Sequence, residues 1–227
     1  MGALGSYGLI ILVMLLGMIV QFNLKNKFRK YSEVMLTSGL TGREVAEKML
    51  HDSGIYDVQV ISTRGQLTDH YNPANRTINL SEGVYETNSV MAAAVAAHET
   101  GHAIQHAKGY APLKMRSAMV PAVSVASRFV SYVLIGGILL LRVFPQLLLA
   151  GIVLFAITTL FSIITLPVEV DASKRALNWL RTAGVTTSQQ QPMAASALRS
   201  AAYTYFVAAI GSLVTLLYYL SIYNNRR

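Results

Sequence analysis

The chain has 227 residues, 53% hydrophobic and only 13% charged, against roughly 25% charged in typical soluble domains, so we expect membrane segments with at most one small domain. It contains no cysteine, which excludes disulfides, iron–sulfur clusters and cysteine-rich zinc ribbons and leaves His, Asp and Glu as metal ligands. The formal charge is +8, but the basic residues flank apolar runs, so they indicate topology and argue against a nucleic-acid partner.

Four apolar runs are each about long enough to cross a bilayer as a helix. The first, residues 4–22, is followed and not preceded by basic residues, so we interpret it as an uncleaved anchor and not as a signal peptide. The second runs from 117 to about 144 and the third from 146 to 166, with Pro145 at the turn of a helical hairpin. The fourth covers roughly 201–223.

These runs divide the chain into five predicted segments. They are an anchor at 1–23, an α+β region at 24–116, a transmembrane hairpin at 117–166, a helical segment at 167–200 and a C-terminal transmembrane helix at 201–227. The basic cluster at 25–30 predicts that region 24–116 is cytoplasmic, and the basic residues between the third and fourth runs agree. Arg226 and Arg227 would then lie outside, against the rule. We predict a multi-pass protein of the cell inner or plasma membrane.

The polar region after the anchor predicts a short helix, a few strands and a second helix. Residues 41–53 carry a capping box of Thr41 and Glu44 and end before Gly54, as a helix would. Alternating residues near 58–60 and 77–80, with a turn between them, predict a small antiparallel hairpin or meander. The alanine-rich stretch from 88 to about 108 predicts the second helix.

This second helix contains the sequence His98-Glu99-x-x-His102. Residues four apart lie on one face of a helix, so both imidazoles can reach one metal ion while Glu99 lies beside it. Zinc lowers the pKa of a bound water to about 7, and Glu99 could take its proton during attack on a peptide bond. The alternative, a chance spacing, is disfavoured because an alanine and valine packing face has no need of histidine. We therefore predict one zinc ion.

A catalytic zinc site needs a third protein ligand. A third histidine six residues after His102 is excluded, because that position is Lys108. His106 is expected to be exposed or to touch the site indirectly. The only acidic residues after Glu99 are Glu169 and Asp171; they could simply stabilise a helix start at Pro167, but one is expected on the metal. Glu169 is favoured as the ligand and Asp171 as a partner that orients a histidine, although the reverse remains open.

The chain resembles the YugP-type membrane zinc metallopeptidases of bacteria. The resemblance rests on residues 97–106 (AHETGHAIQH), 167–173 (PVEVDAS), 67–73 (LTDHYNP), 80–83 (LSEG), 110–113 (YAPL) and 202–205 (AYTY). The layout is also similar to HtpX and the CAAX prenyl endopeptidases. It implies zinc on His98, His102 and Glu169, with Glu99 as general base. The wider group places an aspartate four residues after its ligand glutamate, whereas Asp171 is only two residues after Glu169.

Three further residues are weaker candidates. His70 could border the substrate cleft, next to a strand edge that could pair with an extended peptide; it could equally be an ordinary loop residue. Tyr205 could donate a hydrogen bond to the oxyanion, although such tyrosines are more often interfacial anchors. Arg128, inside an apolar run, could be functional or could mark the membrane surface.

Together these features predict a mainly α integral membrane protein with about four transmembrane helices and a small α+β, zincin-like peptidase region carrying the motif helix. The expected activity is zinc-dependent endopeptidase cleavage of membrane-associated or misfolded proteins, through attack of a zinc-bound water. Two alternatives remain. An intramembrane metalloprotease would need the motif helix to span lipid, and an inactive metal-binding scaffold would have no use for Glu99. The sequence identifies neither the substrate nor any oligomer or adaptor partner.

Overall fold

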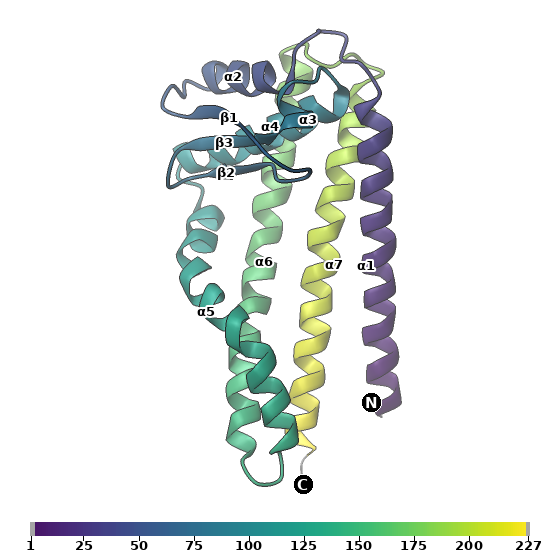
Figure 1. Cartoon of the computed structure of the whole chain (residues 1–227), viewed down its shortest axis with the longest axis vertical. Helices are drawn as coiled ribbons and strands as arrows, with labels where there is room; N and C mark the ends of the chain where they lie inside the picture. The colour runs from purple at the N-terminus through teal and green to yellow at the C-terminus, as the bar shows by residue number, and fades with distance from the viewer. Residues whose placement is uncertain (1–2, 226–227) are drawn as a thin grey trace. The chain divides into compact units, whose positions relative to one another are not determined.

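The computed structural model describes the backbone of residues 3–225 and the side chains of residues 8–225. In chain order the elements are α1 (Ala3–Ser32), α2 (Gly42–Asp52), β1 (Gln59–Thr63), β2 (His70–Asn72), β3 (Thr77–Ser81), α3 (Glu82–Tyr85), α4 (Val90–Ala107), α5 (Ala111–Leu139), α6 (Pro145–Thr182) and α7 (Gln191–Asn224) (Figure 1). The protein is therefore mainly helical, with one small sheet. Arg226 and Arg227, which the predicted topology places outside against the positive-inside rule, lie beyond the described residues.

Contacts divide the chain into two compact units. The first, which we call the helical unit, comprises the N-terminal part up to Ile19, Lys114–Pro167 and the C-terminal part from Thr204. The second, the mixed unit, comprises Val20–Leu113 and Val168–Tyr203 and includes the sheet. Each unit has its own buried cluster of apolar side chains.

Within the described residues, four helices are long and apolar enough to cross a membrane: α1, α5, α6 and α7. This confirms the four predicted spans, but the helices extend well beyond the apolar runs. In particular, the prediction that a new helix begins at Pro167 is wrong, because α6 continues through that residue. Proline lacks a backbone N–H and usually ends a helix, but neighbouring groups make it tolerable inside membrane helices. Glu169 therefore lies on the same helix as the third apolar run.

Glycines allow the helices of the helical unit to pack closely. A Cβ on Gly137 would lie 2.5 Å from the Leu148 Cα atom, so α5 and α6 are almost in backbone contact at the hairpin. Leu134, Leu148 and Ile152 form the buried cluster beside this contact. A Cβ on Gly211 of α7 would lie 2.9 Å from Val13 Cγ1 of α1. Small residues at such crossings are typical of membrane helices.

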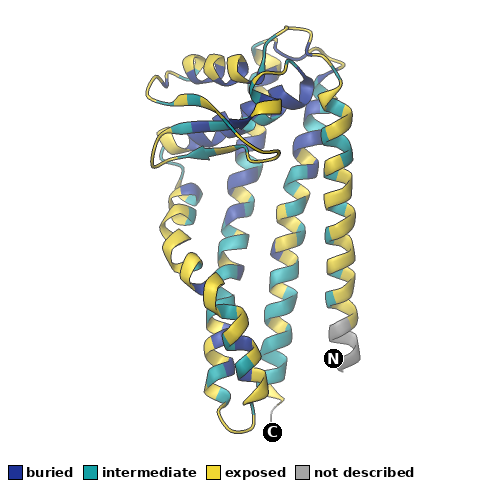
Figure 2. Ribbon diagram, viewed as in Figure 1, coloured by how far each residue is buried: buried dark blue, intermediate teal, exposed yellow. Residues whose placement is uncertain are grey.

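In the mixed unit, α2 and α4 follow the sequence prediction closely. Thr41 caps α2, and its hydroxyl and the Glu44 carboxylate form the reciprocal capping box. Gly54, just after this helix, has a positive φ of 71°, which glycine adopts without strain. Ser89 caps α4 by accepting a hydrogen bond from the Ala92 amide. Figure 2 shows that α4 is among the most deeply buried elements of this unit.

The sheet only partly matches its prediction. Its strand order is β1-β3-β2: β2 pairs antiparallel with β3, as expected of a hairpin, but β1 pairs parallel with β3. The prediction of a fully antiparallel hairpin or meander is therefore wrong. The reason is that the chain reverses direction between β1 and β2 and again between β2 and β3, and β3 lies between the other two strands, so β3 runs parallel to β1. The Asp69 carboxylate secures the connecting loop by accepting hydrogen bonds from the Ser81 amide and hydroxyl.

Candidate metal centre

The histidines of the motif lie on one face of α4. The ring centroids of His98 and His102 are 4.8 Å apart, as expected for residues four apart on a helix. His102 is buried, and His98 has 13% of its side chain exposed. Alanine residues 92–94, 96 and 97 line the buried surface of the same helix, so the core packs closely around α4 up to the first histidine.

Gly101, between the two histidines, lets α6 approach α4. A Cβ at this position would lie 2.7 Å from the Ala172 carbonyl oxygen and 3.1 Å from its Cα atom. Backbone atoms cannot move aside as a flexible side chain can, so any larger residue would push the two helices apart. Both residues belong to the mixed unit. The crossing places the Glu169 side chain opposite the histidines.

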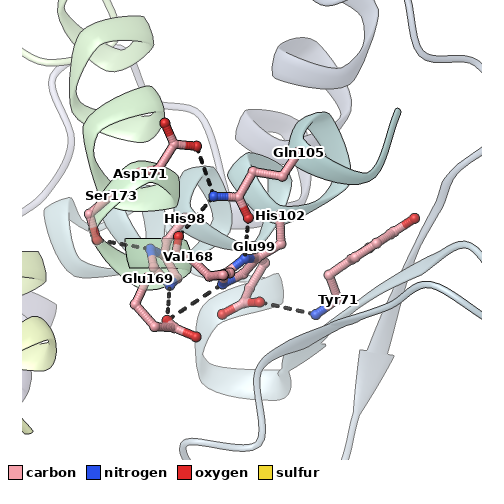
Figure 3. Close-up of polar contacts among 9 residues, drawn as sticks. All are labelled: Tyr71, His98, Glu99, His102, Gln105, Val168, Glu169, Asp171 and Ser173. Carbon is pink, nitrogen blue, oxygen red and sulfur yellow. Dashed lines mark hydrogen bonds and ion pairs between the residues drawn. The ribbon is translucent and has the colours of Figure 1, made fainter. Parts of the chain in front are cut away.

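One carboxylate oxygen of Glu169 faces both rings (Figure 3). It lies 3.2 Å from Nε2 of His98 and 3.6 Å from Nε2 of His102. One ligand atom from each of the three residues lies within 4.8 Å of the others. Ligands about 2.0–2.2 Å from a tetrahedral zinc are roughly 3.3–3.6 Å apart. The spacing and the two-histidine, one-carboxylate donor set therefore fit zinc, and Glu169, only 2% exposed, is otherwise a costly group to bury.

Glu99 is oriented by the sheet. Its Oε2 atom accepts a hydrogen bond from the Tyr71 amide of edge strand β2 at 3.0 Å. Glu99 is 8% exposed, so this bond replaces part of the hydration that the carboxylate lacks. The Tyr71 side chain extends along α4: its hydroxyl is 2.7 Å from Nδ1 of His106, and burial raises the pKa of the phenol.

His102 makes a second polar contact through its other ring nitrogen. Nδ1 lies 3.0 Å from Oε1 of Gln105, and the amide nitrogen of Gln105 donates to the Val168 carbonyl and to Asp171 Oδ2, both at 2.8 Å. Burial lowers the pKa of His102, but the hydrogen bond to Glu169 and the charges of Glu99 and Glu169 outweigh it, so the pKa is raised overall. Arg175 holds Asp171 from the other side.

His98 has a different partner. The hydroxyl of Ser173 lies 3.1 Å from Nδ1 of His98. Ser173 is four residues after Glu169, the position at which the resemblance to the wider group implied an aspartate. Here a neutral hydroxyl occupies it, and the acidic residue two positions earlier reaches the other histidine through Gln105.

Comparison with known proteins identifies the family. A family model described as "Putative neutral zinc metallopeptidase" matches residues 6–224. The chain belongs to this family. The protein named "Putative membrane protease YugP" of Bacillus subtilis (strain 168) is 42% identical over 207 residues, which cover 91% of each chain. No solved structure matches the chain significantly. The resemblance inferred from the motifs is thereby confirmed.

The structure of this zinc metallopeptidase brings some of the predicted site residues together and leaves others apart. His70 begins strand β2, is exposed, and donates a hydrogen bond from Nδ1 to the Thr68 carbonyl at 2.8 Å; it is not part of the metal cluster. His106 is exposed, as expected. Tyr205 lies on α7 and Arg128 on α5. Both belong to the helical unit, whereas the candidate metal ligands belong to the mixed unit, and the roles suggested for Tyr205 and Arg128 stay predictions.

Sequence reasoning missed Ser173 and Gln105. Each lies on the same helix as a ligand candidate, four residues after Glu169 and three after His102. Helical spacing alone would have placed both near the metal. Glutamine and serine are common on helices, however, so only the tertiary contact distinguishes them.

Proposed function

We propose that this protein is a zinc-dependent membrane endopeptidase in which His98, His102 and Glu169 hold one zinc ion. Bound zinc would lower the pKa of a water and polarise the substrate carbonyl. The observation that carries the proposal is the convergence of one ligand atom each from His98, His102 and Glu169 within 4.8 Å, with Glu99 next to His98 on the same helix. The membership of this chain in a zinc metallopeptidase family supports peptidase chemistry.

Glu99 would act as the general base. Its carboxylate takes a proton from the attacking water and delivers it to the leaving amine. The hydrogen bond from the Tyr71 amide holds one oxygen of this carboxylate, which leaves the other oxygen for the proton. Because Tyr71 lies on edge strand β2, an extended substrate could lie along the same strand, close to the base.

The alternatives are less well supported. Helix α4 is not among the four described helices that are long and apolar enough to span a bilayer, which disfavours cleavage deep within lipid. A purely structural zinc site would close its coordination with a fourth ligand and would not need Glu99. We therefore favour cleavage of membrane-associated or misfolded proteins near the membrane surface, on the cytoplasmic side that the basic residues at 25–30 indicate.

Replacement of Glu99 by glutamine tests this function. Glu99→Gln should bind zinc as the wild type does but cleave an unfolded protein substrate about 10²- to 10⁴-fold more slowly, because it cannot take the proton. Cleavage by the full-length protein in detergent, measured with and without a chelator, gives the rate. Glu86→Gln is the matched control, since Glu86 is exposed and outside the motif. Wild-type rates from Glu99→Gln would contradict the mechanism.

A further inference from the structure

Gln105 is a polar side chain with no exposure to solvent. Its amide has two N–H donors and one oxygen acceptor, and a buried amide must satisfy them within the protein. All its recorded partners lie around the metal centre: His102, Val168 and Asp171 (Figure 3). Through Val168 and Asp171 the Gln105 side chain connects α4 to α6.

The partners of Gln105 allow only one orientation of its amide. The Val168 carbonyl and the Asp171 carboxylate can only accept hydrogen bonds, and both lie 2.8 Å from Nε2. The flipped amide would set its oxygen against these two acceptors. The NH₂ group must therefore face α6, which directs Oε1 at Nδ1 of His102, 3.0 Å away.

This orientation determines the tautomer of His102. Because Oε1 can only accept, Nδ1 of the ring must carry the hydrogen. In a neutral imidazole, Nε2 then has the free lone pair. Nε2 is the atom that lies 3.6 Å from Glu169 Oε2, on the side of the other ligand candidates. The amide thus prepares His102 to bind a metal through the correct nitrogen.

The amide is itself held in place. The Asp171 carboxylate accepts hydrogen bonds from Nε of Arg175 at 2.6 Å and from Nη2 at 3.4 Å. The Arg175 guanidinium in turn lies 6.0 Å from the centre of the Tyr110 ring. The backbone amide of Tyr110 donates a hydrogen bond to the backbone carbonyl of Gln105 at 2.9 Å. A continuous series of contacts therefore connects Arg175, Asp171, Gln105 and His102. His98 has no equivalent, because the Ser173 hydroxyl can donate or accept and does not determine a tautomer.

We infer that Gln105 is a positioning residue that fixes the Nδ1–H tautomer of His102 and transmits the effect of the Asp171 carboxylate to this ligand across an amide. The inference rests on the proposed function in that His102 is taken as a zinc ligand. It predicts that the two histidines differ: His102 is set in advance for metal binding, and His98 is not.

Gln105→Met tests the inference, because methionine fills a similar volume without hydrogen bonding. Zinc affinity of the full-length protein, measured by competition with a chromophoric chelator, should fall about 10- to 100-fold, as expected when a histidine loses its orienting partner. Gln190→Met is the matched control. Gln190 is also buried and also bonded through its amide, to the Met35 carbonyl, but it has no recorded contact with a histidine. It should lower the unfolding temperature without changing zinc affinity.

The tautomer can be measured without metal. In zinc-free protein labelled with ¹⁵N-histidine, at a pH where His102 is neutral, its nitrogen shifts should report the Nδ1–H form alone in the wild type and a mixture of tautomers in Gln105→Met. A mixture in the wild type, or unchanged shifts and affinity in Gln105→Met, would overturn the inference. If the wild type binds no zinc, the proposed function fails, but the shifts still decide the role of Gln105.

A double variant guards against misfolding. Gln105→Glu keeps an acceptor for His102 but sets its second carboxylate oxygen against both Asp171 and the Val168 carbonyl; adding Asp171→Asn replaces the first of these repulsions by an N–H donor. The double variant should recover the Nδ1–H tautomer and bind zinc more tightly than Gln105→Met combined with Asp171→Asn, which has no acceptor for Nδ1 of His102. Equal affinities in the two double variants would contradict the inference.

Discussion

Glu169 and Asp171 lie two residues apart on α6, and their carboxylates have different partners. One oxygen of Glu169 faces Nε2 of both histidines, whereas the oxygens of Asp171 are occupied by Arg175 and Gln105. The Asp171 carboxylate already accepts charge-assisted hydrogen bonds from a guanidinium and a hydrogen bond from an amide, and it would lose them on binding a metal. We therefore expect Glu169 to be the ligand and Asp171 to act only through Gln105.

At this scale the sequence predicts much of the candidate site. The spacing of His98, Glu99 and His102 and the scarcity of later acidic residues led to the same three ligand atoms that lie within 4.8 Å in the structure. The sequence led to Asp171 as a partner that orients a histidine, but it gave no sign that the contact would be indirect. The reason is that Gln105 lies between them, and which side chains of two helices meet depends on how the helices cross.

At the scale of elements, the crossing of α4 and α6 depends on Gly101. Alanine there would place its Cβ 2.7 Å from a carbonyl oxygen of α6, so the helices must separate and carry Glu169 away from the histidines. Although alanine favours a helix by about 1 kcal/mol over glycine, overpacking should cost about 1–3 kcal/mol. We expect Gly101→Ala to weaken zinc binding and lower the unfolding temperature.

Thermal unfolding and zinc titration of the full-length protein in detergent would measure both effects. Gly83→Ala is the matched control, because nothing lies within 4 Å of a Cβ at Gly83 of α3. It should leave zinc affinity unchanged. If Gly101→Ala behaved like the control, close approach of the two helices would not be what sets the site.

Local signals predicted the helices better than the sheet. The capping residues Thr41 and Ser89 determined where α2 and α4 begin, because caps act within a few residues. The parallel pairing of β1 with β3 joins strands that are not consecutive, and no local pattern specifies it. Pro167 misled for a related reason: its usual helix-breaking effect is overridden where surrounding groups support the helix.

At the scale of the whole molecule, the distribution of basic residues predicts the topology. Basic residues follow the apolar runs of the first and third candidate spans, at positions 25–30 and 174–181. The region after α1 and the loop after α6 should face the cytoplasm, and the turn between α5 and α6 should face outside.

Single cysteines can test this arrangement cleanly, because the chain has none. We expect a membrane-impermeant maleimide to label Arg142→Cys, in the exposed turn after α5, in sealed right-side-out vesicles. Lys48→Cys, exposed on α2, should react only after the vesicles are opened. If Lys48→Cys reacted in sealed vesicles and Arg142→Cys reacted only after opening, the candidate metal centre would lie on the outer side and the cytoplasmic assignment would be wrong.

The central claim is that one zinc ion is held by His98, His102 and Glu169, and zinc content tests it most directly. Wild-type protein purified full-length should contain one equivalent, and Glu169→Ala should contain almost none at the same free zinc concentration. Asp171→Ala is the matched comparison: it should bind more weakly than the wild type but still reach one equivalent when zinc is raised. If zinc survived in Glu169→Ala and was lost in Asp171→Ala, the ligand assignment would be wrong.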